Sequence, residues 1–218
     1  METQKNNTRI VLVQLLRNTS IIWVDIDGVL SDTIGAVLVE INKKHGNIMD
    51  FSQWKTWNPH QIDQLREIGI ATIEDTISLF YSILKKDWSQ IVSAIPGSQD
   101  WIQKFASMGK RLIALSGRIE SSRLYTTEWL SQNYQSWAFQ EIFLTDHDTP
   151  KQVEKYELAR QHDIWLMIED NAQYAINLAT HGIPTILLEV PWNIDIDTSG
   201  YPDIYRVKDW QEIIWLLG

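Results

Sequence analysis

Two aspartates lie at the end of a short apolar segment near the start of the chain. The sequence IIWVDIDGVL places the apolar run 21–24 directly before Asp25, with Asp27 two positions later and Gly28 next. Like charges held this close together cost free energy unless a cation or a reaction uses them. The pair therefore indicates a cation site or a catalytic site.

Three further segments contain or follow apolar runs and carry side chains that could take part in catalysis or binding. They read RLIALSGR, DTPKQVEKYELARQH and DIWLMIEDN. They supply a hydroxyl group, a glycine, cations and carboxylates, at Ser116, Gly117, Arg118, Lys151, Lys155, Glu169 and Asp170. If the apolar runs are parallel neighbours, their carboxyl ends meet at one edge of a sheet, where such sheets bind ligands.

This set of side chains has one consistent use. Clustered carboxylates and a main-chain carbonyl form the hard oxygen site that Mg²⁺ prefers, and the cation offsets their repulsion. A phosphate can then bind between the metal, the Ser116 hydroxyl, backbone amides at a helix start and a lysine. Asp25 would be the nucleophile that forms an aspartyl-phosphate. Asp27 would be the general acid for the leaving oxygen and then the base for water.

The elements that must position these residues alternate between apolar runs and helical periodicity. Apolar runs predict strands at 21–24, 111–117, 141–145, 163–170 and 183–190. Helical spacing predicts helices at 32–45, 72–85, 100–109, about 120–132, from about 151, 172–180 and 209–218. In the helix at 120–132, Leu124, Trp129 and Leu130 are expected to face the core. From about residue 96 the order is helix–strand, repeated, which predicts an α/β fold with a doubly wound parallel sheet.

Residues 31–94 break this order with a helical insertion directly after the first predicted strand. We therefore expect an α/β core domain from residues 1–30 and 95–218, with a small helical cap at 31–94. The cap contains the aromatic loop FSQWKTWNPH, in which Trp54 and Trp57 could stack on a base. Core packing is the commoner role in a chain with 11 tryptophans.

Composition narrows the class of protein. The chain has 218 residues, a net charge of -9 and no run of Lys and Arg, so we expect no nucleic-acid polymer and no anionic membrane as partner. It has no cysteine, which excludes disulfides and thiolate chemistry, and its five histidines show no zinc-ligand spacing. The N-terminus lacks the pattern of a signal peptide, which predicts a cytoplasmic protein.

The four motifs together resemble those of the haloacid dehalogenase-like (HAD) phosphohydrolases. The resemblance runs over WVDIDGVL, LIALSG, a lysine ahead of the last motif and the acidic pair of MIED, from about residue 21 to 190. It implies a Rossmannoid core with a cap, a Mg²⁺ cofactor and a small phosphorylated substrate. It also implies a set of roles: Asp25 as nucleophile and metal ligand, Asp27 as acid/base and metal ligand through its carbonyl, Ser116 and Gly117 as phosphate site, Lys155 as counter-charge, Asp170 as metal ligand.

Several stretches are more similar to one branch, the cytosolic 5′(3′)-deoxyribonucleotidases and bacterial nucleotidase-like proteins. They are PGSQDWIQKFASMGKRLIALSGR, YTTEWL, KYELARQHDIWLMIEDN and ILLEVPWN. This similarity implies a nucleoside monophosphate as substrate. The alternatives are a sugar phosphate or another phosphorylated metabolite, or a catalytically idle HAD-like domain that binds a ligand or partner. The chain departs from the branch at residues 116–118, where relatives often have Thr-Ser/Ala-Arg, and at Glu169, where many have aspartate.

Some roles stay open at this point. Lys155 is preferred to Lys151 because one helix separates it from Asp170, as is usual in the family. Glu169 could contact the metal directly or support it from the second shell, and the second position is preferred. Arg118 could clamp phosphate or hold the end of the sheet. Trp192 and Asn193 could border the site or belong to an ordinary loop.

Overall fold

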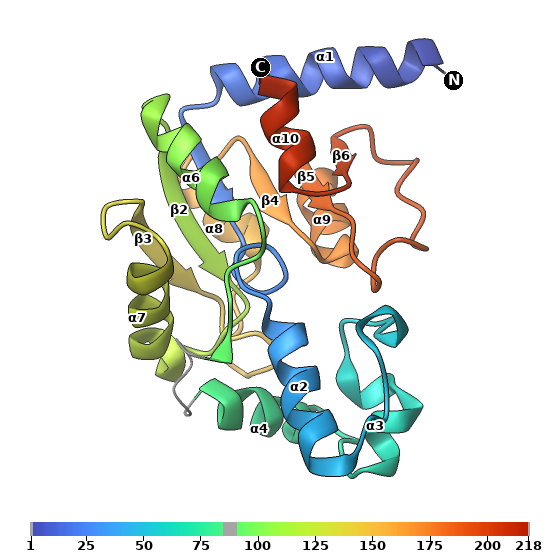
Figure 1. The fold of residues 1–218 in the computed structure, drawn as a ribbon. Helices are drawn as coiled ribbons and strands as arrows, with labels where there is room; N and C mark the ends of the chain where they lie inside the picture. The colour runs from blue at the N-terminus through green and yellow to red at the C-terminus, as the bar shows by residue number, and fades with distance from the viewer. Residues whose placement is uncertain (1, 85–90, 218) are drawn as a thin grey trace.

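The centre of the protein is a parallel sheet. A computed structural model describes residues 2–84 and 91–217, and in this part of the chain six strands pair in the order β3-β2-β1-β4-β5-β6 (Figure 1). All five neighbouring pairs are parallel. The strands are β1 (Ile21–Val24), β2 (Arg111–Ser116), β3 (Phe139–Leu144), β4 (Met167–Glu169), β5 (Thr185–Leu188) and β6 (Ile204–Val207). The chain order reverses between β1 and β4, so the predicted doubly wound sheet is confirmed and its ligand-binding switch point lies at β1.

Helices cover both faces of the sheet, as the apolar strands require. In β1, Ile22 and Val24 pack in one buried cluster and Trp23 in another, because successive strand residues point to opposite faces. The first cluster receives α1 (Glu2–Asn18), α6 (Ser98–Ser107), α7 (Arg123–Asn133) and α10 (Trp210–Leu217). The second receives α8 (Lys155–Gln161) and α9 (Ala172–Thr180).

A helical segment leaves the sheet after β1 and returns before α6. It contains α2 (Thr33–His45), η1 (Phe51–Gln53), η2 (Pro59–Gln61), α3 (Asp63–Glu67) and α4 (Ile73–Leu84), below the sheet in Figure 1. The two ends of the segment are joined: Ser31 bridges Ala94, and the Asp32 amide donates to the Ser93 carbonyl at 2.9 Å. This supports our proposal that residues 31–94 form a cap on the core, although 85–90 lie outside the described residues.

Several predicted elements differ from the observed ones. Leu124, predicted to face the core, is 63% exposed, whereas Thr126, Trp129 and Leu130 are buried. Residues two apart on a helix lie on nearly opposite faces, so burial of Thr126 turns Leu124 to solvent. The helix predicted from about residue 151 begins only at Lys155.

Helix α1, the short helix α3 and strand β6 were not predicted. Among the described strands, β6 lies at the edge of the sheet and pairs with β5. Its sequence IYRV is too short and too mixed to stand out as a buried strand. In the part of the chain that the structure describes, no helix is both long and apolar enough to cross a membrane.

Candidate active site

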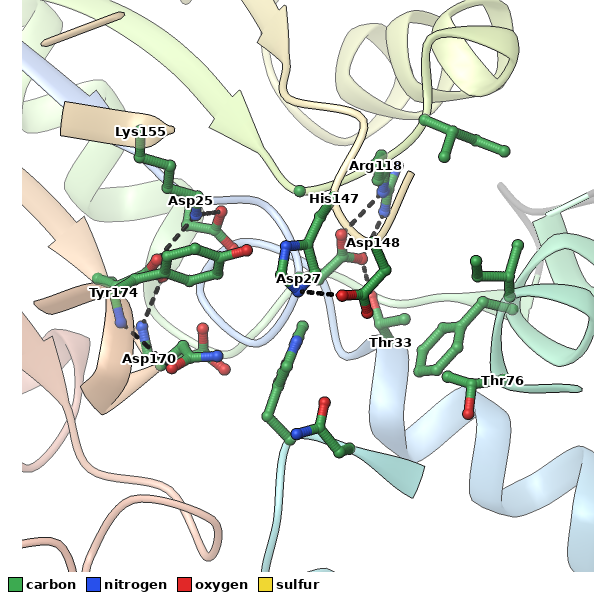
Figure 2. A pocket seen from close by; sticks show the side chains of 18 of the residues that line it. Asp25, Asp27, Thr33, Thr76, Arg118, His147, Asp148, Lys155, Asp170 and Tyr174 are labelled. Carbon is green, nitrogen blue, oxygen red and sulfur yellow. Dashed lines mark hydrogen bonds and ion pairs between the residues drawn. The ribbon is translucent and has the colours of Figure 1, made fainter. Parts of the chain in front are cut away.

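The residues singled out from the sequence gather at the carboxyl ends of three adjacent strands. Asp25 directly follows β1, Ser116 is the last residue of β2, and Glu169 is the last residue of β4. Lys155 opens helix α8 and reaches the same place from the face that α8 covers. Asp25, Lys155 and Glu169 line the pocket that Figure 2 shows, whereas Ser116 is fully buried and does not line it.

A buried lysine lies between two carboxylates at the centre of the site. The Lys155 ammonium donates to Asp25 Oδ1 at 2.5 Å and to Glu169 Oε1 at 2.7 Å. Burial would lower the pKa of Lys155, but the carboxylates of Asp25 and Glu169 outweigh it and raise that pKa. Lys151 is exposed. The structure therefore favours Lys155 over Lys151 as the cation of the site.

The Asp170 carboxylate is held on one side and left open on the other. Its Oδ2 accepts a hydrogen bond from Trp192 Nε1 at 2.9 Å, and Asn193 Nδ2 donates to the Asp170 carbonyl at 2.6 Å. Trp192 and Asn193 therefore border the site. Asp170 Oδ1 is buried without a hydrogen-bond partner among the described residues. Gly28 makes this packing possible, because a Cβ at that position, where φ is +83°, would overlap the Asp170 carboxylate.

These carboxylates fit a divalent cation. Asp25, Glu169 and Asp170 each offer an oxygen, and these oxygens lie within 4.8 Å of one another. Burial, with repulsion from Glu169, raises the pKa of Asp25 and that of Asp170. Both Glu169 oxygens already accept hydrogen bonds, from Lys155 and from the Asp170 amide. Asp25 and Asp170 are thus the side chains that could bind a cation. Glu169 would hold Lys155 and the Asp170 backbone in place beside them.

Asp27 occupies a different environment. Its two oxygens accept hydrogen bonds from Arg118 Nη2 at 2.8 Å and Nε at 2.9 Å, from Thr33 Oγ1 at 2.5 Å and from Ser116 Oγ at 3.1 Å. Burial would raise the pKa of Asp27, but the Arg118 charge and these hydrogen bonds outweigh it and lower that pKa. Arg118 also donates to Thr126 Oγ1 at 3.0 Å. In this arrangement Arg118 positions Asp27.

The pocket also contains residues that were not predicted from the sequence, among them Thr33, His147, Asp148 and Tyr174. The Tyr174 ring lies 4.4 Å from Lys155 Nζ and packs edge-on against the His147 ring. Thr33 is the first residue of α2 and Tyr174 lies in the first turn of α9, so neither stands in a recognisable motif. The run DHD at 146–148 is a turn signal, but nothing in it indicates a position over the site.

The cap forms the wall of the pocket opposite the sheet, and its two candidate tryptophans have different surroundings. Trp57 lines the pocket, as do the cap residues Asn58, Thr76, Ile77, Phe80 and Tyr81. Trp54 is fully buried in the core cluster and does not line it. Of the two roles that the sequence leaves open for Trp54, the structure therefore supports core packing. Its neighbours in the folded chain bury it, and the spacing of the two tryptophans along the loop does not reveal this.

Solved structures with a similar fold include several phosphatases. A predicted phosphatase from Clostridium acetobutylicum is 15% identical, with a TM-score of 0.63 over 91% of this chain and 98% of that one. A predicted phosphoglycolate phosphatase from Haemophilus somnus is 13% identical, with a TM-score of 0.61 over 92% and 98%. CbbY from Rhodobacter sphaeroides, solved in complex with phosphate, is 15% identical, with a TM-score of 0.58 over 89% and 96%. At these identities the likeness shows the fold alone.

A family model is more specific. No curated protein sequence matches the chain. The model of the 5′ nucleotidase, deoxy (pyrimidine), cytosolic type C proteins matches residues 19–217, which include every strand of the sheet and the whole pocket. The match leaves out the whole of α1. The chain therefore belongs to this family of 5′ nucleotidases, and it is a phosphatase of the nucleotidase-like type.

Proposed function

We propose that the protein hydrolyses a nucleoside monophosphate with the help of Mg²⁺, through a phosphate ester formed on Asp25. One observation carries this proposal: the Lys155 ammonium donates to Asp25 Oδ1 at 2.5 Å, and the Oδ1 of the neighbouring Asp170 has no hydrogen-bond partner among the described residues. A carboxylate that lines a pocket and contacts a buried cation is placed to act as a nucleophile.

In the first step, a carboxylate oxygen of Asp25 attacks phosphorus and the bond to the leaving oxygen breaks. Lys155 stabilises the negative charge of the transferred group, and the Ser116 hydroxyl and the Gly117 backbone lie at the same strand end. The leaving oxygen takes a proton from Asp27. In the second step, Asp27 accepts a proton from water, which attacks phosphorus, releases phosphate and restores the Asp25 carboxylate.

Arg118 imposes a condition on this cycle. Its two hydrogen bonds keep Asp27 ionised, which suits the second step but not the first. Bound phosphate can accept N–H groups of Arg118 and so loosen the hold on Asp27. Asp25 and Asp170, with the Asp27 carbonyl, would hold Mg²⁺, which would neutralise charge on the phosphate when bound.

The cap wall supports a nucleotide as substrate. Trp57, Phe80 and Tyr81 give the pocket aromatic side chains, and Asn58 and Thr76 add polar groups able to hydrogen-bond a base. Stacking on aromatic rings tolerates every base because each base has a π-face. The same wall leaves room for a small substrate, so a nucleoside monophosphate fits the pocket better than a nucleic-acid polymer does.

The test is a panel of phosphate esters assayed for released phosphate, with Mg²⁺ and with a chelator. We expect nucleoside monophosphates to give the highest kcat/KM, above sugar phosphates and a generic aryl phosphate. A clear preference for sugar phosphates would replace the substrate proposal. Unchanged activity in the chelator would contradict the metal proposal and leave the substrate result intact.

Asp170→Asn is expected to weaken Mg²⁺ binding while the fold survives, because the substitution keeps the shape but removes the charge. Loss of a carboxylate from such a site should weaken affinity by at least about tenfold. Titration calorimetry with Mg²⁺ measures this directly. Asp195→Asn, at an exposed acidic position of the neighbouring groove, is the matched control. Equal affinity in wild type and Asp170→Asn would show that Asp170 is not a ligand.

Trp57→Ala is expected to raise KM for the nucleotide more than for a small aryl phosphate. Loss of one stacking contact costs roughly 1–3 kcal/mol. Trp54→Ala should act on stability instead, lowering the free energy of unfolding by about 3–5 kcal/mol because it empties a buried site. Kinetics with both substrates and urea unfolding separate the two effects. Equal losses on both substrates in Trp57→Ala would make Trp57 a packing residue.

A further inference from the structure

We propose that Asp148 selects substrates by charge, by disfavouring leaving groups that carry a second negative group. The inference rests on the proposed phosphatase cycle and deepens it, since it concerns what is attached to the phosphate. It follows from the loop between β3 and α8, from the distribution of charge in the pocket and from the place of Asp148 within it.

The loop is held firmly over the end of β2. The amides of Thr145, Asp146 and His147 donate to the carbonyls of Ser116, Arg118 and Gly117, at 2.9, 3.2 and 3.0 Å. These bonds extend the pairing of β2 with β3 beyond the last strand residues. The loop therefore has a defined position relative to the phosphate end of the pocket.

The backbone of this loop is strained on both sides of His147. Asp146 has a φ of 50° and Asp148 a φ of 58°, in the left-handed region that non-glycine residues rarely adopt. Such conformations persist where the surrounding structure enforces them, and they cluster at functional sites. In this conformation the two successive side chains of His147 and Asp148 both line the pocket (Figure 2).

The charges of the pocket are unevenly distributed. Among its described lining residues the cations are Lys155 and Arg118, and both contact carboxylates at the phosphate end. Beyond that end the lining is uncharged apart from Asp148, since burial lowers the pKa of His147 and favours its neutral form. The remaining lining comes from side chains such as Ile77, Phe80 and Ile119.

Asp148 therefore sets the electrostatic character of the leaving-group compartment. Its side chain is 35% exposed and lies 3.4 Å from His147 Nε2. A carboxylate or second phosphate on the leaving group would meet a like charge in partly buried surroundings, where repulsion is only partly screened. A neutral leaving group with N–H or O–H groups would find a hydrogen-bond acceptor there. Selection by repulsion as well as attraction is a common route to specificity.

A second groove, which shares His147 and Asp148 with the pocket, limits the choice of probe molecules. Lys55 lines that groove and lies 4.0 Å from Asp195, so a long anionic leaving group could reach a cation there. Small probes avoid this contact. Phosphoglycolate and 2-hydroxyethyl phosphate have the same two-carbon frame and differ by one carboxylate, which makes them a matched pair.

The experiment compares kcat/KM for this pair in wild type, Asp148→Asn and Asp146→Asn. Asparagine tolerates a positive φ, so both variants keep the loop conformation. Asp146→Asn is the control because Asp146 does not line the pocket and its Oδ1 accepts from the Glu120 amide at 2.8 Å. We expect wild type and Asp146→Asn to prefer the neutral ester, and Asp148→Asn to reduce that preference roughly three- to tenfold through the KM of phosphoglycolate.

The effect should also shrink in wild type as ionic strength rises, because salt screens the repulsion. An unchanged preference in Asp148→Asn, or an equal change in Asp146→Asn, would overturn the proposal. If neither these esters nor nucleoside monophosphates are turned over, the proposed phosphatase cycle fails separately. Calorimetric affinities of the same two esters for the three proteins then give the same comparison without turnover.

Discussion

Replacing Asp25 with asparagine is expected to abolish turnover without weakening the fold. An amide oxygen is a poor nucleophile, and removal of a nucleophile that acts in concert with its neighbours typically costs about 10⁴-fold or more in kcat. The stability should hold or rise. Asparagine still accepts a hydrogen bond from Lys155, while one of three buried carboxylates that repel one another is gone.

Two measurements check this expectation. Phosphate release gives kcat, and thermal unfolding in a chelator gives the melting temperature of the cation-free protein. An acid-quenched reaction of wild type should contain a phosphorylated peptide that includes Asp25, and the variant should not. Asp63→Asn, at an exposed position in the cap, is the control for loss of one negative charge. Near wild-type turnover in Asp25→Asn would show that the covalent route is wrong.

Replacing Lys155 with methionine is expected to remove activity and destabilise the protein together. Methionine fills a similar volume but leaves Asp25 and Glu169 buried without their cation. Breaking a buried ion pair by removing one partner typically costs about 3–5 kcal/mol. The transferred phosphate also loses its counter-charge, which should lower kcat by about 10²–10³-fold, as when a single oxyanion donor is removed.

The control and the rescue distinguish these effects. Lys151→Met removes an exposed ammonium nearby and should change neither activity nor the free energy of unfolding by more than about 0.5 kcal/mol. Glu169→Gln combined with Lys155→Met should recover part of the stability, because it neutralises one unpaired carboxylate, but none of the activity. If Lys151→Met is the damaging substitution, Lys155 has been given the wrong role.

The order of motifs along the chain was enough to predict the α/β fold and which residues meet. Asp25, Ser116 and Glu169 lie at strand ends because apolar β-rich runs lead directly into them. Parallel strands place those ends at one edge whatever the helices between them do. Local pattern therefore carried this information, whereas the choice of Lys155 came from the family resemblance, in which one helix separates the lysine from the acidic motif.

Roles that depend on which partner a side chain finds could not be predicted in the same way. From the sequence, Arg118 could either bind phosphate or hold the end of the sheet. In the structure it donates hydrogen bonds to Asp27 and Thr126, and these three residues come from separate parts of the chain. The same holds for Trp192, whose indole reaches Asp170 across the sheet edge from a loop after β5.

By itself the sequence predicted five of the six described strands, the carboxylates at their ends and the lysine beside them, because hydrophobic periodicity and strand-end motifs are local properties of the chain. Tertiary structure alone decided which tryptophan of the loop at 51–60 reaches the pocket, with Trp57 lining it and Trp54 fully buried. It also brought His147 and Asp148 over the site. Burial and electrostatic surroundings are set by neighbours that are distant in sequence, and periodicity within one segment does not record them.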